Sequence, residues 1–124
     1  MLNKDGIRKT SYGTPKQILF NVEHQVGVGC IVPQSMGVAV DGGKKYALAG
    51  TPIMIDLEDT MKEVQAATTK ANAVLIHDVD VTDGAANGAA LIFGFVNLNR
   101  LEEQVVNKIK AVTDMSSLLT FAKL

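Results

Sequence analysis

The sequence contains no tryptophan, and aromatic side chains make up only 5% of its 124 residues. The core must therefore be built mainly from aliphatic side chains. Cys30 is the only cysteine, so no disulfide can form within one chain, and folding needs no oxidising compartment. No run approaches 18 apolar residues, and no apolar stretch follows the charges of the N-terminal MLNKDGIRKT. We therefore expect no membrane span, no secretory signal, and assembly in a cytoplasm.

The chain also lacks a strong excess of charge, because its formal net charge is −1. This balance argues against a protein that binds nucleic acid by its overall charge. The charges are unevenly spread, however: residues 56–83 carry a net −5, and residues 1–16 carry a net +3 from Lys4, Arg8, Lys9 and Lys16 against Asp5. These two regions either favour self-association and docking to a charged partner, or are simply solvated surfaces.

The basic segment has the composition of an extended arm. Gly6, Gly13 and Pro15 interrupt it, and no helical or alternating pattern runs through it. Tyr12 is its only aromatic residue, whereas binding to single-stranded nucleic acid normally uses more aromatic side chains and more charge. A protein partner is the better interpretation, since an extended arm can add a strand to an exposed sheet edge. The sequence thus divides into an arm at 1–16 and one domain at 17–124.

The first half of that domain predicts short strands and turns. Asp41-Gly42-Gly43 has the turn chemistry of a hairpin joining residues 37–40 to 44–48. Residues 56–71 are polar, and we expect one or two helical turns there, with Met61 and Val64 facing inward. The other expected elements are a strand at 18–22, an irregular, buried, glycine-rich segment at 26–36, a turn at 49–52 and an apolar run at 53–55.

The second half predicts a longer hairpin, residues 73–81 with 89–96, followed by a helix. Residues 73–76 are apolar throughout, which indicates burial on both faces, whereas Val79 and Val81 alternate with aspartates. Gly94 marks a bulge or a close backbone contact. The helix should begin after an Asn99 N-cap, with a stripe of Leu101, Val105, Ile109 and Val112, and a last short strand at 118–121. The expected fold class is mainly β (α+β), a small β-rich domain with hairpins and one short C-terminal helix.

No group of residues in the sequence forms a convincing catalytic, cofactor-binding or metal-binding site. His77-Asp78-Val79-Asp80 is the most site-like cluster, but successive strand side chains diverge, and two carboxylates are a poor set for a transition metal. His24 has no companions at ligand spacing, and Cys30 has the apolar setting of a buried structural thiol. Residues 26–29 hold only a G-x-G fragment of a dinucleotide loop. We therefore predict no catalytic, cofactor-binding or metal-binding residue, and a protein that is not an enzyme.

The order of three segments carries a resemblance. "AGTPI" at 49–53 is followed by "ANAVLIHDVDVTDG" at 71–84 and by "ALIFGFVNLNRLEE" at 90–103. This arrangement resembles the head (capsid) decoration proteins of tailed bacteriophages, the group related to the decoration protein of phage lambda. The resemblance covers roughly residues 35–105. The chain departs from the lambda protein in lacking its tryptophans and in the composition of its arm and C-terminus.

The resemblance implies a structural virion protein without enzymatic activity or cofactor. It implies trimers that bind the outside of the expanded icosahedral head at threefold and quasi-threefold positions and stabilise it against DNA pressure. The partners would be the major capsid protein and two further copies of the chain, with no direct contact to nucleic acid or membrane, and assembly would occur in the host bacterial cytoplasm. The arm residues expected to contact the capsid are Lys4, Arg8, Lys9, Tyr12, Pro15 and Lys16. Phe93, Phe95 and Leu101 are candidate trimer contacts, with ordinary core positions the favoured interpretation.

Three alternatives stay open. The chain could be another virion component, such as a head fibre base, neck or tail protein, which would occupy a ring or spike. A small ligand-binding or enzymatic domain would need a concave pocket around His77 or Cys30. A nucleic-acid-binding module would show steeply salt-dependent binding that requires residues 1–16.

Overall fold

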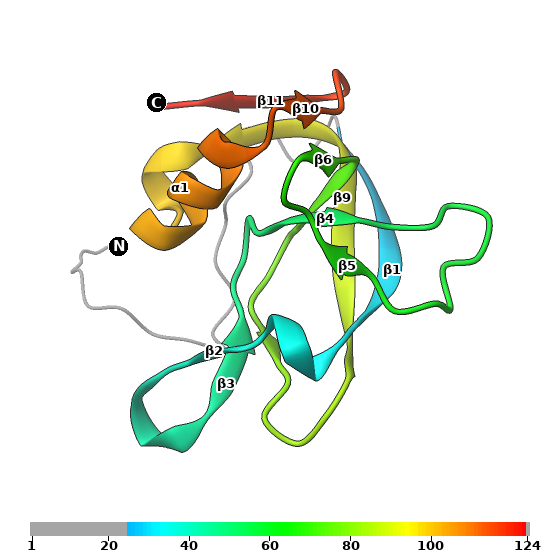
Figure 1. Ribbon diagram of the computed structural model, residues 1–124. Coiled ribbons are helices and arrows are strands. Elements are labelled where there is room, and N and C mark those ends of the chain that lie inside the picture. Colours follow the sequence, from blue (N-terminus) through cyan, green and yellow to red (C-terminus); the bar gives the residue numbers. More distant parts are fainter. Residues whose placement is uncertain (1–24, 124) are drawn as a thin grey trace.

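A computed structural model describes residues 25–123 of the chain (Figure 1). The expected arm at 1–16, the strand at 18–22 and His24 lie outside these residues. The described part is mainly β with one α-helix, which confirms the expected fold class. Its regular elements are β1 (Val26–Val32), η1 (Gln34–Met36), β2 (Val38–Ala39), η2 (Asp41–Gly43), β3 (Lys45–Ala47), β4 (Pro52–Met54), β5 (Gln65–Ala66), β6 (Lys70–Ala71), β7 (Ala73–Leu75), β8 (Val79–Asp80), β9 (Ala86–Asn97), η3 (Leu98–Arg100), α1 (Glu103–Ala111), β10 (Asp114–Met115) and β11 (Leu119–Ala122).

The twelve-residue strand β9 organises the main sheet. Six strands form this sheet in the order β1-β9-β7-β4-β5, and β11 also pairs with β9, in parallel. Two small sheets flank it, β10-β6 and β2-β3-β8. Apolar side chains pack on both faces of the main sheet. Helix α1 lies at one side of this sheet (Figure 1). Its Val105 and Ile109 belong to a further apolar cluster. Strand β9 therefore touches segments from the beginning, middle and end of the described chain.

The glycine-rich segment that was expected to be irregular begins with a regular strand. β1 pairs antiparallel with β9 along its whole length, with a bulge between Val26 and Gly27. The expectation failed because Gly27 and Gly29 are exposed at the margin of the sheet, where a strand needs no packed side chain. The β9 partner supplies the backbone hydrogen bonds that glycine propensity alone would not secure.

The two predicted hairpins have different outcomes. β2 pairs with β3 around Gly42 and Gly43, whose φ angles of 86° and 76° confirm the turn. β7 pairs with β9, and residues 73–75 are fully buried, as expected. The continuation at β8, however, pairs with β3 instead of β9, so the longer hairpin was predicted only in part. The carboxylate of Asp78 accepts a hydrogen bond from the Ala49 N–H at 2.8 Å, which helps to hold β8 near the first half of the chain.

The segment at 56–71 contains no helix; it forms a loop followed by β5 and β6. Asp56 accepts a hydrogen bond from the Glu58 N–H, and Asp59 accepts one from the Met61 N–H. Such local bonds compete with helical hydrogen bonding. Val64 is buried as expected, but the inward placement of Met61 was wrong, because 76% of that residue is exposed.

The C-terminal helix starts later than predicted. α1 has Glu102 as its N-cap residue, and no side chain caps it. Asn99 lies instead within η3, whose own N-cap, Asn97, accepts a hydrogen bond from the Asn99 N–H at 3.0 Å. The expected stripe is largely confirmed, because Val105, Ile109 and Val112 are buried. The expected last strand is β11, which joins the main sheet.

Candidate docking surface

The side chains of the His77–Asp80 cluster do not gather at one point but lie at different places around β8 and the residues just before it. His77 and Asp80 are exposed, whereas Asp78 is half-buried and holds the Ala49 backbone. Across residues 25–123, no three histidine, cysteine or carboxylate side chains lie close enough to hold a metal ion. The arrangement gives each aspartate a structural role in fixing a neighbouring backbone.

The structural role of Asp80 is reflected in the pKa of its carboxyl group. Hydrogen bonds from the Thr82 side chain and backbone, the side chain first, hold the pKa of Asp80 below its ordinary value of 3.8. The ionised carboxylate is therefore the form that the fold favours. Because the folded-state pKa is lowered, this contribution to stability is present at neutral pH and is lost as the pH falls below the ordinary value.

Cys30 lies inside the sheet and is only 4% exposed. Burial raises the pKa of its thiol, which lowers the thiolate fraction at neutral pH. Its neighbours include Val32, Val79 and Ala90 in the same apolar cluster. This environment matches the inert structural thiol expected from the sequence.

We expect Cys30 in the native protein to react with a thiol reagent at least about tenfold more slowly than in denaturant, because burial limits both access and ionisation. Following absorbance with Ellman's reagent measures the rate. A matched control is Val26→Cys in a Cys30→Ser background, since residue 26 begins the same strand but is 47% exposed. Equal native rates for Cys30 and the control would contradict the assignment.

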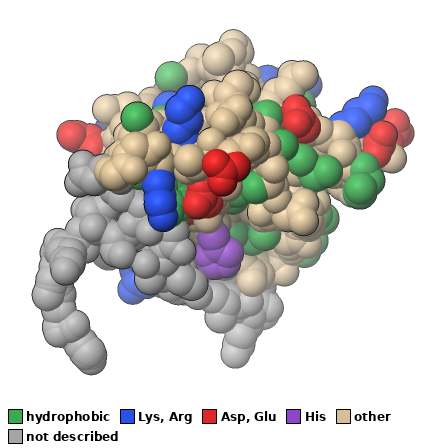
Figure 2. All heavy atoms as spheres, turned by 90° about the horizontal axis from the view of Figure 1, so that it is seen from below, with side chains coloured by type: hydrophobic (Ala, Val, Ile, Leu, Met, Phe, Trp, Pro, Cys, Tyr) green, Lys and Arg blue, Asp and Glu red, His purple; other side chains and the backbone are tan. Residues whose placement is uncertain are grey.

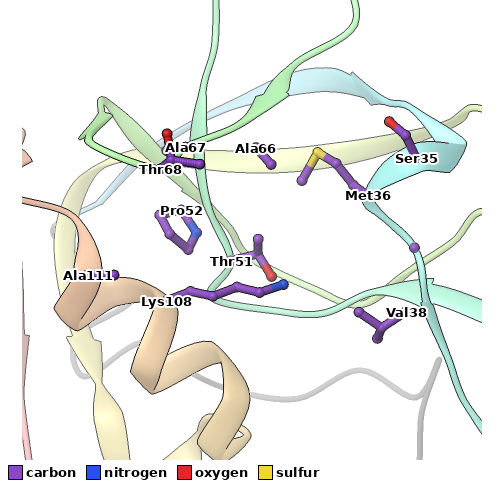
Figure 3. A pocket seen from close by; sticks show the side chains of 11 residues that line it. Ser35, Met36, Val38, Thr51, Pro52, Ala66, Ala67, Thr68, Lys108 and Ala111 are labelled. Atoms are coloured by element: carbon purple, nitrogen blue, oxygen red, sulfur yellow. The ribbon is translucent and has the colours of Figure 1, made fainter.

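A groove of about 330 Å³ lies between η1, β4, β5 and α1 (Figure 3). Apolar side chains from Met36, Val38, Pro52 and Ala66 line much of it, and Lys108 extends along one side from α1. Neither His77 nor Cys30 lies in it. It contains no carboxylate, histidine or cysteine among its lining residues. Cys30 lines a second groove of about 490 Å³, beside Thr60 and Met61, but only 4% of this residue is exposed.

The most prominent surface feature is a set of exposed apolar side chains on β1, on β9 and on the residue just before β11. We call this set the apolar face; its members are Val26 (47% exposed), Phe93 (40%), Phe95 (44%) and Leu118 (53%). Val26 lies directly opposite Phe93 in the sheet. Leu118 adjoins β9, since its carbonyl accepts a hydrogen bond from the Gly94 N–H at 3.2 Å. Exposed apolar side chains grouped in this way commonly mark an interaction surface.

Gly94 explains why the two phenylalanines face outward. A Cβ atom at this position would lie 3.3 Å from the Leu91 side chain, so residue 94 faces the buried Leu91 cluster. Because neighbouring strand residues point to opposite sides, Phe93 and Phe95 face away from that cluster. Their interpretation as ordinary core was wrong.

Leu101 is separated from the two phenylalanines. It is half-buried and packs against the Leu91 cluster and the cluster beneath α1, so its core interpretation is confirmed. Val26 and Leu118 were missed by sequence reasoning. The signal for Leu118 was available, because the neighbouring Leu119 and Phe121 already supply the inward positions of a strand.

A second surface feature is the loop between β4 and β5, which we call the acidic loop and define as residues 56–63. It holds four carboxylates and one lysine, a net charge of −3. Figure 1 shows it projecting from the main sheet, and Figure 2 shows acidic, basic and hydrophobic side chains gathered on this projection. The Glu58 N–H, followed by Lys62, holds the pKa of Asp56 below its ordinary value. The fold therefore favours the ionised form of Asp56.

No protein-family model and no curated protein matches this chain. Within residues 25–123, no helix is both long and apolar enough to cross a membrane.

Proposed function

We propose that this chain is a capsid decoration protein of a tailed bacteriophage, which binds the outside of the expanded head as a trimer and stabilises it. The observation that carries the proposal is that the three segments resembling decoration proteins pack together as one unit. The Gly50 N–H donates to the Leu75 carbonyl at 2.7 Å, and the Leu75 N–H donates to the Thr51 carbonyl at 3.1 Å. β7 in turn pairs with β9, so turn, strand and return strand are joined directly.

The apolar face supports an attachment role. Aromatic side chains contribute strongly to protein interfaces, and Phe93 and Phe95 lie in neighbouring outward positions of one strand. We assign the apolar face to contacts between copies of the chain. Three copies would then present three basic arms to the shell. The arm residues that contact the major capsid protein are Lys4, Arg8, Lys9, Tyr12, Pro15 and Lys16.

The stabilising mechanism is mechanical. A trimer that bridges several capsid subunits forces their relative motion to break many contacts together. Each arm is anchored through the same trimer, so the binding of one arm raises the effective concentration of the other two. A protein that binds only the expanded shell also stabilises that state by mass action.

The direct test mixes the purified protein with undecorated shells of the phage that encodes it, in expanded and unexpanded forms. We expect saturable co-sedimentation with expanded shells and density at threefold positions in particle images. Saturable binding to neither form would refute the proposal. Density confined to a neck, tail or fibre base would favour another virion component.

A variant pair tests the apolar face in the same assay. The double change Phe93→Ser and Phe95→Ser should weaken trimer formation and shell binding by about tenfold or more, because aromatic side chains commonly supply much of an interface's free energy. Ala39→Ser is the control, since Ala39 is also exposed but lies in β2, outside both the apolar face and the acidic loop. Sedimentation velocity measures the trimer, and equal behaviour of both variants would remove the apolar face from the interface.

A further inference from the structure

Among residues 25–123, strand β1 leaves one edge of the main sheet available along most of its length. Within this part of the chain, the sheet order places β1 at an end, with β9 as its only strand partner. At the far end of β1, Ile31 forms a parallel bridge with Glu63, and its carbonyl accepts a hydrogen bond from the Val64 N–H at 2.9 Å. The backbone groups of Ile31 therefore point away from β9. Because backbone direction alternates along a strand, those of Gly29 and Gly27 point the same way.

These two glycines make the edge accessible; we call their outward backbone groups the β1 edge. Both residues are exposed, and no atom lies within 4 Å of the position that a Cβ would occupy on Gly29. A groove of about 490 Å³ separates Gly29 and Ile31 from Thr60 and Met61. An exposed strand edge with unpaired N–H and carbonyl groups is a template for an additional extended segment.

The acidic loop adjoins this edge, because Glu63 is bridged to Ile31. Its shape is fixed by the Asp56 and Asp59 hydrogen bonds and by an ion pair of 3.5 Å between Lys62 and Asp56. A segment lying along the β1 edge and past the groove would therefore meet a net charge of −3. An extended and basic segment complements this surface both in its backbone and in its charge.

The chain itself contains such a segment at residues 1–16, with a net charge of +3. Fully extended, sixteen residues span about 50 Å, which is enough to reach a neighbouring copy. Nine residues, 17–25, join the arm to β1. Fully extended, they span about 30 Å, so the tether adds to the reach of the arm toward a neighbouring copy.

We propose that the basic arm of one copy docks on the β1 edge and the acidic loop of a second copy, adding a strand to its main sheet. This exchange concerns the free protein and does not depend on the proposed shell binding. The two are linked, however, because the docked arm carries the same residues that are proposed to contact the capsid. A neighbouring copy would hold each arm until a shell competes for it.

A charge-exchange experiment on the full chain tests the proposal. In the arm variant, Arg8→Glu with Lys9→Glu changes the arm from a net +3 to −1. In the loop variant, Glu58→Lys with Glu63→Lys changes the acidic loop from −3 to +1 and leaves the turn-forming Asp56 and Asp59 in place. We expect each variant alone to self-associate about tenfold more weakly than the natural chain, and an equimolar mixture to recover association. Sedimentation velocity without shells measures all three samples.

Amide hydrogen exchange by NMR locates the contact. The Gly27 and Gly29 amides should exchange at least about tenfold faster in either variant alone than in the natural chain, with protection restored in the mixture. The Val28 amide is the internal control, because the same alternation directs it toward β9. Unchanged association in both variants, or a mixture that fails to recover, would overturn the proposal. Altered Gly29 exchange in a chain that stays monomeric would also overturn it, by showing that the arm binds its own copy. Shell binding is measured separately, so failure here leaves the decoration function standing.

Discussion

Deletion of residues 1–16 is expected to leave the domain folded and to weaken its binding to expanded shells by at least about a hundredfold. The domain should fold because, within the described residues 25–123, the buried side chains of the three clusters belong to residues 30–119. Binding should fall steeply because a trimer would lose all three arms together, and with them the gain in effective concentration. Co-sedimentation gives the affinity, and thermal unfolding checks the fold.

A shuffled arm separates charge from sequence in this experiment. A variant with the same sixteen residues in a different order keeps the net charge of +3. If backbone pairing and side-chain order matter, the shuffled chain should bind nearly as weakly as the deletion. If the deletion itself binds shells like the natural chain, the arm has no anchoring role, and the domain must bind by another surface.

Replacement of Gly50 by alanine is expected to lower the free energy of unfolding by about 2–4 kcal/mol. Gly50 has φ of 88°, a conformation that costs an L-residue energy on its own. An added Cβ would also lie 2.6 Å from one Leu101 methyl carbon and 2.9 Å from the other. The turn between the β3 region and β4 would therefore be strained and overpacked at once.

Gly42→Ala is the matched control for that substitution. Gly42 has nearly the same φ, 86°, but no atom lies within 4 Å of its Cβ position. The Gly42→Ala variant should lose about 1 kcal/mol of unfolding free energy, which is the cost of the backbone conformation alone. Urea denaturation of both variants gives the difference, and a Gly50→Ala, Leu101→Ala double variant should show strong coupling, since the smaller side chain removes the overlap. Equal losses for Gly42 and Gly50 would contradict the packing argument.

Local sequence signals predicted those parts of the fold that local chemistry decides. The Asp41-Gly42-Gly43 turn and the buried strand at 73–75 followed from turn residues and an unbroken apolar run. The loop at 56–63 was misread, because its polar spacing is compatible with a helix and only the Asp56 and Asp59 hydrogen bonds decide against it. Strand β1 was missed because its stability comes from a partner about sixty residues away in the chain.

The apolar face was predicted only in part, again because it depends on pairing between strands that are distant in the sequence. Leu91 and Phe93 are two residues apart and would share a face in a regular strand. The irregular pairing opposite Val26 and Gly27 breaks that alternation, so Leu91 is buried and Phe93 is 40% exposed. No residue pattern within β9 reveals a bulge whose position depends on pairing with β1. The position of Phe93 and Phe95 in an apolar run therefore indicated buried core side chains, although both belong to the exposed apolar face.

The central position of β9 has a consequence for how the protein is made. Its partners are β1, β7 and β11, so the main sheet cannot be completed until residues 119–122 have left the ribosome. Until then, the nascent chain carries an incomplete sheet with an open strand edge, the state in which β-proteins are most exposed to aggregation. Folding of this domain is thus complete only when its last strand has joined, and its yield in the cell should depend on how quickly β11 joins the sheet.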